Sequence, residues 1–157
     1  MLAMVEHVEH GLVGVHRTWL AVDGSAKASL DPVRMSTGSI RGGAVRLAPA
    51  ADELLIAEGI ETALAGSQAT GMPAWAALST SGMVALVLPA IVRTVIILAD
   101  HDASGAGERA AYNAADRWLS EGRRVRIAMP PEPGTDFNDV LLGRAHARIE
   151  EARDVAA

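Results

Sequence analysis

The chain has 157 residues, of which 50% are hydrophobic, 3% aromatic and 21% charged, with a formal net charge of −5. This length suits one domain with a sizeable core, built mainly from aliphatic residues because aromatic residues are few. Cysteine is absent, which excludes a disulfide framework and a thiolate metal site. No apolar run is long enough to cross a bilayer and no secretory signal is visible, so we expect a cytoplasmic protein without a membrane partner.

Residues 1–49 are predicted to form a small β-rich N-terminal segment, ahead of a second unit at residues 50–157. Residues 1–9 carry few structural signals, so we expect them to fray or to pack loosely. Residues 11–22 are rich in β-branched side chains and predict a strand, which Asp23-Gly24 ends as a turn. The following stretch, through Lys27 and Arg34, is less regular, and residues 44–47 predict another short strand.

From Glu53 onward the pattern predicts alternating strands and helices. Apolar runs predict strands at residues 54–57, 74–78, 94–99 and 124–129, the last of them nearer an edge of the sheet. The predicted helices follow Gly59, with a face of Ile60, Ala63, Leu64 and Ser67, and Gly105, with an alanine-rich face that includes Trp118. Residues 79–82 predict a polar turn, 83–88 a short helix or connector, and the chain is expected to end in a polar helix from about Val140. This order predicts an α/β fold with a mainly parallel four-stranded sheet flanked by helices.

Acidic side chains follow three of the predicted strands. Glu58 comes after the first strand and Asp100 and Asp102 end the third, while Asp136 and Asp139 follow the fourth. Because parallel strands end along one edge of a sheet, these carboxylates can converge there. Converging carboxylates repel one another, so a divalent cation is expected among them, and all-oxygen ligands favour Mg²⁺ or Mn²⁺ over zinc. Such a site acts on phosphates, with Glu58 as a further ligand or as a general acid/base.

Each signal has an ordinary structural explanation when it is taken alone. Glu58-Gly59 can be a turn, the aspartates can cap helices or fill loops, and Glu61 can complement a helix dipole. His101 points away from its neighbouring aspartates in an extended strand, which makes it a solvated neighbour and not a ligand. His7, His10 and His16 suggest a metal site only weakly without cysteines. The case for a metal site therefore depends on the conjunction of the acidic motifs.

Three segments in this order resemble the Toprim domain, a Rossmann-like fold, and most closely its form in phage- and plasmid-type DNA primases and primase-helicases. They are Leu55-Ile56-Ala57-Glu58-Gly59-Ile60-Glu61-Thr62-Ala63-Leu64, Leu98-Ala99-Asp100-His101-Asp102-Ala103-Ser104-Gly105 and Gly134-Thr135-Asp136-Phe137-Asn138-Asp139. The resemblance implies that Glu58 is the general acid/base, that Asp100 and Asp102 bind metal, and that Asp136 and Asp139 help to hold a second ion. Segments 15–20, 24–28 and 42–47 resemble the region that precedes Toprim in such primases.

Several features of these primases are missing from the chain. It has no Walker A pattern and no cysteine-based zinc module, so the sequence indicates a catalytic fragment of a larger replication protein or a short stand-alone relative. Lys27 is the only lysine, so phosphate binding falls largely to arginines. The candidates for binding nucleic acid or nucleotide are Arg17, Lys27, Arg34, Arg41 and Arg46.

The sequence therefore predicts a Mg²⁺-dependent nucleotidyltransferase, the catalytic Toprim core of a DNA primase. Its expected partners are a DNA template, nucleoside triphosphates, and a replicative helicase or further domains of a parent protein. Two alternatives stay open: a Toprim nuclease, and a non-catalytic module for nucleic-acid binding or assembly whose acids hold a structural ion. A phosphohydrolase or receiver-like domain is less favoured, because its phosphate lysine is expected near the acids and Lys27 lies far upstream.

Overall fold

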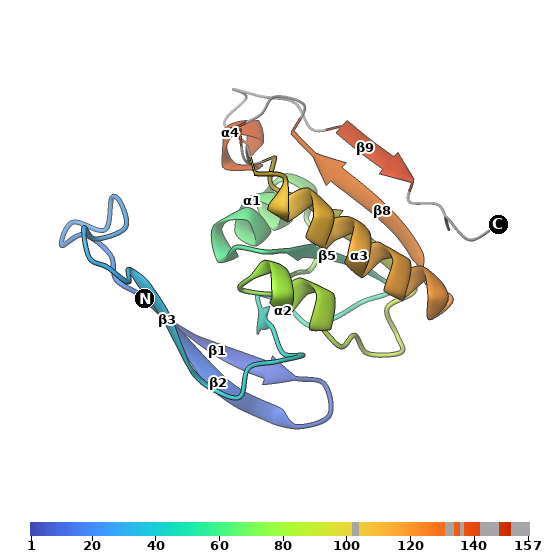
Figure 1. The fold of residues 1–157 in the computed structure, drawn as a ribbon, viewed down its shortest axis with the longest axis horizontal. Helices are drawn as coiled ribbons and strands as arrows, with labels where there is room; N and C mark the ends of the chain where they lie inside the picture. Colours follow the sequence, from blue (N-terminus) through green and yellow to red (C-terminus); the bar gives the residue numbers. More distant parts are fainter. Residues whose placement is uncertain (102–103, 131–133, 136, 142–147, 152–157) are drawn as a thin grey trace.

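The computed structural model describes residues 1–101, 104–130, 134–135, 137–141 and 148–151. Two sheets organise these residues, a small antiparallel one near the N-terminus and a larger one covered by helices (Figure 1). The larger sheet has the strand order β4-β6-β5-β7-β8-β9. Its strands are β4 (Val45–Arg46), β5 (Glu53–Ala57), β6 (Ala74–Ala76), β7 (Thr94–Leu98), β8 (Arg124–Met129) and β9 (Arg148–Glu151).

The four predicted α/β strands form the parallel centre of this sheet. The pairs β6–β5, β5–β7 and β7–β8 are parallel, whereas β4–β6 and β8–β9 at the two ends are antiparallel. The predicted mainly parallel α/β fold is therefore confirmed, with one antiparallel strand added at each edge. The prediction of a closing helix from about Val140 is wrong, because α4 (Phe137–Leu141) is short and Arg148–Glu151 pairs with β8 as a strand.

Helices cover both faces of the main sheet (Figure 1). On one face α1 (Ile60–Thr70) and α4 pack over Leu55, Ala57 and Leu98. On the other face α2 (Thr80–Ala85) and α3 (Ala106–Ser120) enclose a layer that includes the fully buried Trp75 and Trp118. Strands with apolar side chains on both faces form such two-sided cores.

The first helix has the predicted bounds but a different buried face. Gly71 closes α1 in the left-handed conformation, with φ of 73°, and its N–H bonds to the Ser67 carbonyl. Leu64, predicted to be on the buried face, is 49% exposed, while Ala63 and Gly66 lie against the sheet. A Cβ at position 66 would come within 2.3 Å of Leu98 Cδ1, so glycine allows the helix to pack this closely.

The second helix begins earlier than predicted. Residues 79–82 were predicted to be a polar turn, but Ser79 is the N-cap of α2, and its Oγ accepts a hydrogen bond of 2.9 Å from the Gly82 N–H. The polar residues are therefore the first turn of the helix, where a serine hydroxyl satisfies an otherwise unpaired amide.

The N-terminal segment forms an antiparallel sheet in the order β1-β2-β3. It contains β1 (Leu2–His7), β2 (Gly11–Thr18) and β3 (Arg34–Gly38). The expectation that residues 1–9 fray or pack loosely is wrong, because β1 pairs with β2. Val5 of β1 is fully buried, in the same hydrophobic core cluster as Ile60 and Ala63 of α1. Gly24, at φ of 72°, confirms the predicted turn, whereas β3 lies in a stretch that was predicted to be irregular.

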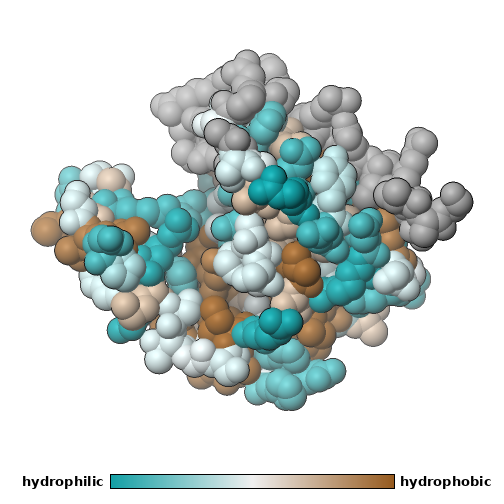
Figure 2. Space-filling model, viewed as in Figure 1, coloured by the Kyte–Doolittle hydropathy of each residue, from teal (hydrophilic) through white to brown (hydrophobic). Residues whose placement is uncertain are grey.

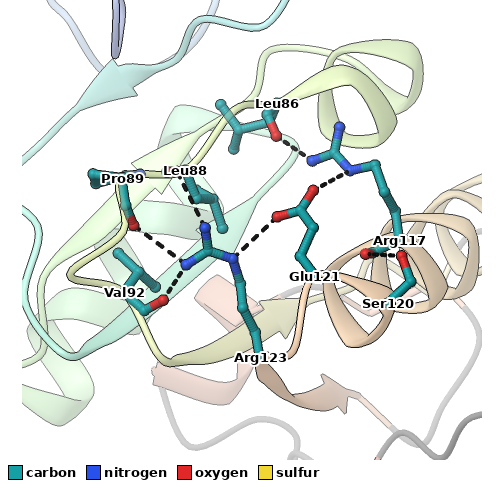
Figure 3. Close-up of polar contacts among 8 residues, drawn as sticks. All are labelled: Leu86, Leu88, Pro89, Val92, Arg117, Ser120, Glu121 and Arg123. Carbon is teal, nitrogen blue, oxygen red and sulfur yellow. Dashed lines mark hydrogen bonds and ion pairs between the residues drawn. The ribbon is translucent and has the colours of Figure 1, made fainter.

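An arginine clamp, Arg117 and Arg123, joins the connection between α2 and β7 to the end of α3 (Figure 3). Arg123 donates hydrogen bonds to three carbonyls of this connection, those of Leu88, Pro89 and Val92. Arg117 donates to the Leu86 carbonyl, and Glu121 forms ion pairs of 3.4 Å with Arg117 and 3.1 Å with Arg123. This network fixes the loop that leads into the central strand β7.

Hydrophilic and hydrophobic side chains are interspersed on the face shown in Figure 2. Within the described part of the chain, no helix has the length and apolar character needed to span a membrane.

Candidate active site

Glu58 and Asp100 lie at the carboxyl ends of two adjacent parallel strands. In the register of β5 and β7, Ala57 pairs with Leu98. Glu58 directly follows β5, and Asp100 is the second residue after β7, so both leave the sheet at the same edge. Both residues are half-buried. The strand order therefore brings together two of the predicted acids that are far apart in sequence.

A hydrogen bond connects Asp100 to the first turn of α1. The Thr62 hydroxyl donates to Asp100 Oδ1 over 3.3 Å. Since α1 starts at Ile60, directly after Glu58-Gly59, this bond holds Asp100 beside the turn that carries Glu58. The first amides of α1 also lie at this edge, where a helix N-terminus favours negatively charged groups.

Two of the remaining predicted acids, Asp102 and Asp136, lie outside the described residues. The third, Asp139, lies inside α4, which begins at Phe137, so Asp139 is not the N-cap of this helix. The Gly134 N–H donates to the His101 carbonyl over 2.8 Å. The segment two residues before Asp136 therefore lies beside the segment that follows Asp100.

His101 faces the end of β8. Its Nδ1 lies 2.9 Å from the Pro130 carbonyl, and because a carbonyl only accepts, Nδ1 carries the proton in this bond. The ring is half-buried and bonded to protein, so it is not simply the solvated neighbour that the sequence predicted.

The N-terminal sheet forms the wall opposite Glu58. A small pocket lies between this sheet and the start of α1. Its lining includes side chains of both parts, those of His16, Thr18, Arg34, Glu58, Glu61 and Leu78. His16 and Thr18 are alternate residues of β2 and therefore share one face of the strand. The pocket combines two carboxylates, an arginine, an imidazole and a hydroxyl.

Lys27 is joined to this pocket through Glu61. Its Nζ lies 2.8 Å from Glu61 Oε1. Burial acts to raise the pKa of Glu61, but the Lys27 hydrogen bond and the nearby Lys27 and Arg34 charges hold this pKa below its usual value. Glu61 is therefore ionised at neutral pH and neutralises Lys27, which leaves Arg34 as the cation of the pocket lining.

The other basic candidates lie away from the pocket. Arg17, between His16 and Thr18 on β2, bonds to Thr37 Oγ1 over 3.2 Å and does not line the pocket. Arg46 pairs with Glu6 at 3.4 Å and stacks over the Trp75 ring at 4.4 Å. Arg41 is exposed in the loop before β4. Of the five basic candidates, the structure thus brings Arg34 and, through Glu61, Lys27 to the acidic edge.

A second group of possible metal ligands lies in the turn between β1 and β2. In the described part of the chain, His7, Glu9 and His10 have ligand atoms within 4.8 Å of one another. However, His7 Nδ1 accepts a hydrogen bond from the Glu9 amide, and His7 Nε2 lies against Gly42. The turn is separate from the pocket at Glu58, and both nitrogens of His7 face other protein groups.

Residues 53–147 match the family model of the Toprim domain. This chain belongs to the Toprim family. The predicted resemblance is thereby confirmed at the level of the domain. Ahead of it, residues 1–47 of the Toprim chain match a domain of unknown function, DUF7146. No curated protein sequence matches the chain.

The Toprim chain is similar in fold to solved DNA primases. It shares 19% identity with the structure of the DnaG catalytic core, at a TM-score of 0.60, covering 92% of this chain and 48% of that one. It shares 19% identity with a DNA primase domain from Pseudomonas aeruginosa, at a TM-score of 0.55 and coverages of 92% and 53%. The zinc-binding and RNA polymerase domains of the Aquifex aeolicus primase match at 18% identity, a TM-score of 0.61 and coverages of 94% and 40%. The chain thus spans about half the length of these structures.

The contribution of β2 to this candidate site is not predicted by the sequence. The sequence offers His16 only as a weak metal candidate and gives Thr18 no role. Neither carries a local signal, because their approach to Glu58 results from the packing of the N-terminal sheet against α1. Alternation along β2 could at most have indicated that both residues share one face.

Proposed function

We propose that the chain is the catalytic Toprim part of a DNA primase of the phage or plasmid type, which joins nucleotides on a DNA template. The observation that carries this proposal is the placement of Glu58 and Asp100 at adjacent parallel strand ends, with Arg34 across the pocket from Glu58. The primase-like fold and the three Toprim motifs support it. We further propose that residues 1–49 and 50–157 are its two parts, in keeping with the two family matches.

The residues of the site fit a hard divalent cation. Glu58 and Asp100 present carboxylate oxygens, the ligands that Mg²⁺ and Mn²⁺ prefer. In the proposal, Asp100, Asp102, Asp136 and Asp139 hold the ions, with Glu58 as a ligand or as general acid/base. A bound cation would stabilise negative charge on the phosphates during transfer.

The protein's own groups would then orient the substrate. Glu58 would accept a proton from the attacking 3′-hydroxyl, since a half-buried carboxylate at this position can act as a base. Arg34 would bind a phosphate of the nucleotide or the template, and Lys27 would do so when phosphate competes with Glu61. Arg17, Arg41 and Arg46 would contact nucleic acid outside the pocket. Further domains of a parent protein or a replicative helicase would supply the remaining functions of a primase.

Primer synthesis by variants of the metal-binding aspartates tests the proposal. We expect Asp100→Asn and Asp102→Asn to abolish Mg²⁺-dependent synthesis of oligonucleotides on single-stranded DNA by the intact protein. Asp116→Asn, an exposed position on α3, is the matched control and should keep full activity. Shortened DNA in place of new oligonucleotides would identify a nuclease instead. Unchanged synthesis by both variants would refute the catalytic site.

A further inference from the structure

His16 is almost completely buried, yet its hydrogen bonding is incomplete within the described residues. The side chain is 6% exposed, and its Nδ1 lies 2.9 Å from Ser36 Oγ on the neighbouring strand β3. The described part of the chain offers no hydrogen-bond partner to the other ring nitrogen, Nε2. Nε2 is not one of the fully buried atoms that lack a partner, so it opens toward the pocket that His16 lines, where a bound group can accept its hydrogen bond.

Several hydrogen-bond donors surround this imidazole and favour a ligand with oxygen acceptors, and Arg34 offsets the carboxyl group of Glu58 in the same lining. Arg34 lines the same pocket, and the first amides of α1, an eleven-residue helix, lie at Gly59 and Ile60 in its wall. The Thr18 hydroxyl is a further donor on the same face of β2. The negative charge of Glu61 is offset by Lys27. Burial and the charge of Arg34 lower the pKa of His16, so the ring is neutral at pH 7 and acts through hydrogen bonding.

We propose that His16 is a substrate-binding residue, whose Nε2–H donates a hydrogen bond to a phosphate oxygen of the nucleotide or DNA strand bound beside Glu58. In this arrangement the Ser36 hydroxyl donates to Nδ1 and thereby fixes the tautomer that carries the proton on Nε2. The inference rests on the proposed function. It also gives the N-terminal segment a role, because β2 and β3 then supply part of the substrate site.

Two replacements separate the roles of the two ring nitrogens. An asparagine amide reaches about as far as Nδ1, so His16→Asn can keep the bond to Ser36 but loses the group at Nε2. A glutamine amide reaches about as far as Nε2, so His16→Gln can keep the contact with phosphate but loses the bond to Ser36. His10→Asn, an exposed histidine in the β1–β2 turn, is the matched control. Far-UV circular dichroism and the melting temperature establish that each variant is folded.

Binding to the full chain is measured with two probes at low salt. Fluorescence anisotropy of a labelled oligothymidylate reports the DNA strand, and titration with Mg²⁺·ATP reports the nucleotide. We expect His16→Asn to raise the Kd of one probe by roughly tenfold to a hundredfold, the range for a lost hydrogen bond to a charged group. We expect His16→Gln to stay within about threefold of the unchanged protein. The probe that is affected identifies the source of the phosphate.

Two results would overturn the inference. The first is unchanged binding by His16→Asn, whatever His16→Gln does, and the second is equal weakening of binding in both folded variants. Weakened binding by His16→Gln in either case would assign His16 to its contact with Ser36. Because these readouts are binding constants, they stand apart from the proposed catalysis, which fails on its own if Asp100→Asn leaves primer synthesis unchanged.

Discussion

Replacing Arg123 by alanine would release the loop that leads into the central strand β7. The guanidinium group donates to the carbonyls of Leu88, Pro89 and Val92 and pairs with Glu121, while the Arg123 side chain is 13% exposed (Figure 3). Alanine would leave several partly buried acceptors without a donor. Such acceptors are costly to leave unpaired because water reaches them poorly.

The expected loss in the free energy of unfolding is about 3 kcal/mol. A hydrogen bond to a charged group contributes roughly 1.5–3 kcal/mol, and bonds that share one guanidinium are not additive. For a chain of this size the loss corresponds to a fall in Tm of roughly 6–12 °C. Arg123→Lys should lose an intermediate amount, because an ammonium group cannot bond three separated carbonyls in one plane. Urea denaturation at an unchanged m-value measures these differences.

Arg93→Ala is the matched control in the same loop. Arg93 forms an ion pair of 3.5 Å with Asp52, and the two side chains are 80% and 57% exposed. An exposed pair of this kind contributes less than about 1 kcal/mol, so this variant should unfold almost as the unchanged protein does. If Arg123→Ala were no less stable than Arg93→Ala, the clamp would not hold the loop and the reasoning would be wrong.

Further predictions concern the start of α2 and the titration of β2. Ser79→Ala should cost about 1 kcal/mol of unfolding free energy in urea by removing the N-cap, whereas a neutral result would show that the amide of Gly82 needs no cap. Gly82→Ala should cost roughly 1–3 kcal/mol, since its Cβ would lie 2.1 Å from the Ala77 carbonyl oxygen; wild-type stability would contradict this contact. Burial and Arg34 lower the pKa of His16 from 6.5, so the unfolded chain binds more protons and stability falls as pH drops below 6.5. His16→Asn should reduce this slope in urea titrations between about pH 5 and 7.5, and an unchanged slope would contradict it.

The parallel centre of the fold could be predicted because its signals are local. After its first residue, each of β5 and β7 is continuously apolar, as expected of strands buried on both faces. Gly71 and Gly122 mark helix ends with φ of 73° and 82°. Strands β1, β3 and β9 could not be predicted in the same way. Their side chains carry no consistent pattern, and pairing with β2 or β8 determines their conformation.

The residues of the candidate site likewise differ in how far the sequence predicts their positions. The positions of Glu58 and Asp100 follow from the strand order, so a sequence pattern of acids after apolar runs was sufficient to predict that they meet at one edge. Their roles in metal binding and catalysis stay predictions. By contrast, Arg34 and His16 reach the pocket only through the packing of β2 and β3 against the start of α1, and charge alone did not distinguish Arg34 from Arg17.

The N-terminal sheet is predicted to unfold together with the Toprim core. Val5 of β1 is fully buried in the hydrophobic core cluster that includes residues of α1. Glu6 and Ala44 exchange backbone hydrogen bonds of 2.9 and 3.0 Å. A small sheet with an exposed apolar face at Leu2 and Met4 has little core of its own, so its stability must come from these contacts. In native-state hydrogen exchange, we therefore expect the amides of β2 to open with the same free energy as those of β7. Val5→Ala should lower both by about 2 kcal/mol. Early exchange of β2 alone would show instead that the sheet opens independently, and that the pocket lined by His16 and Arg34 can open while Glu58 and Asp100 stay in place.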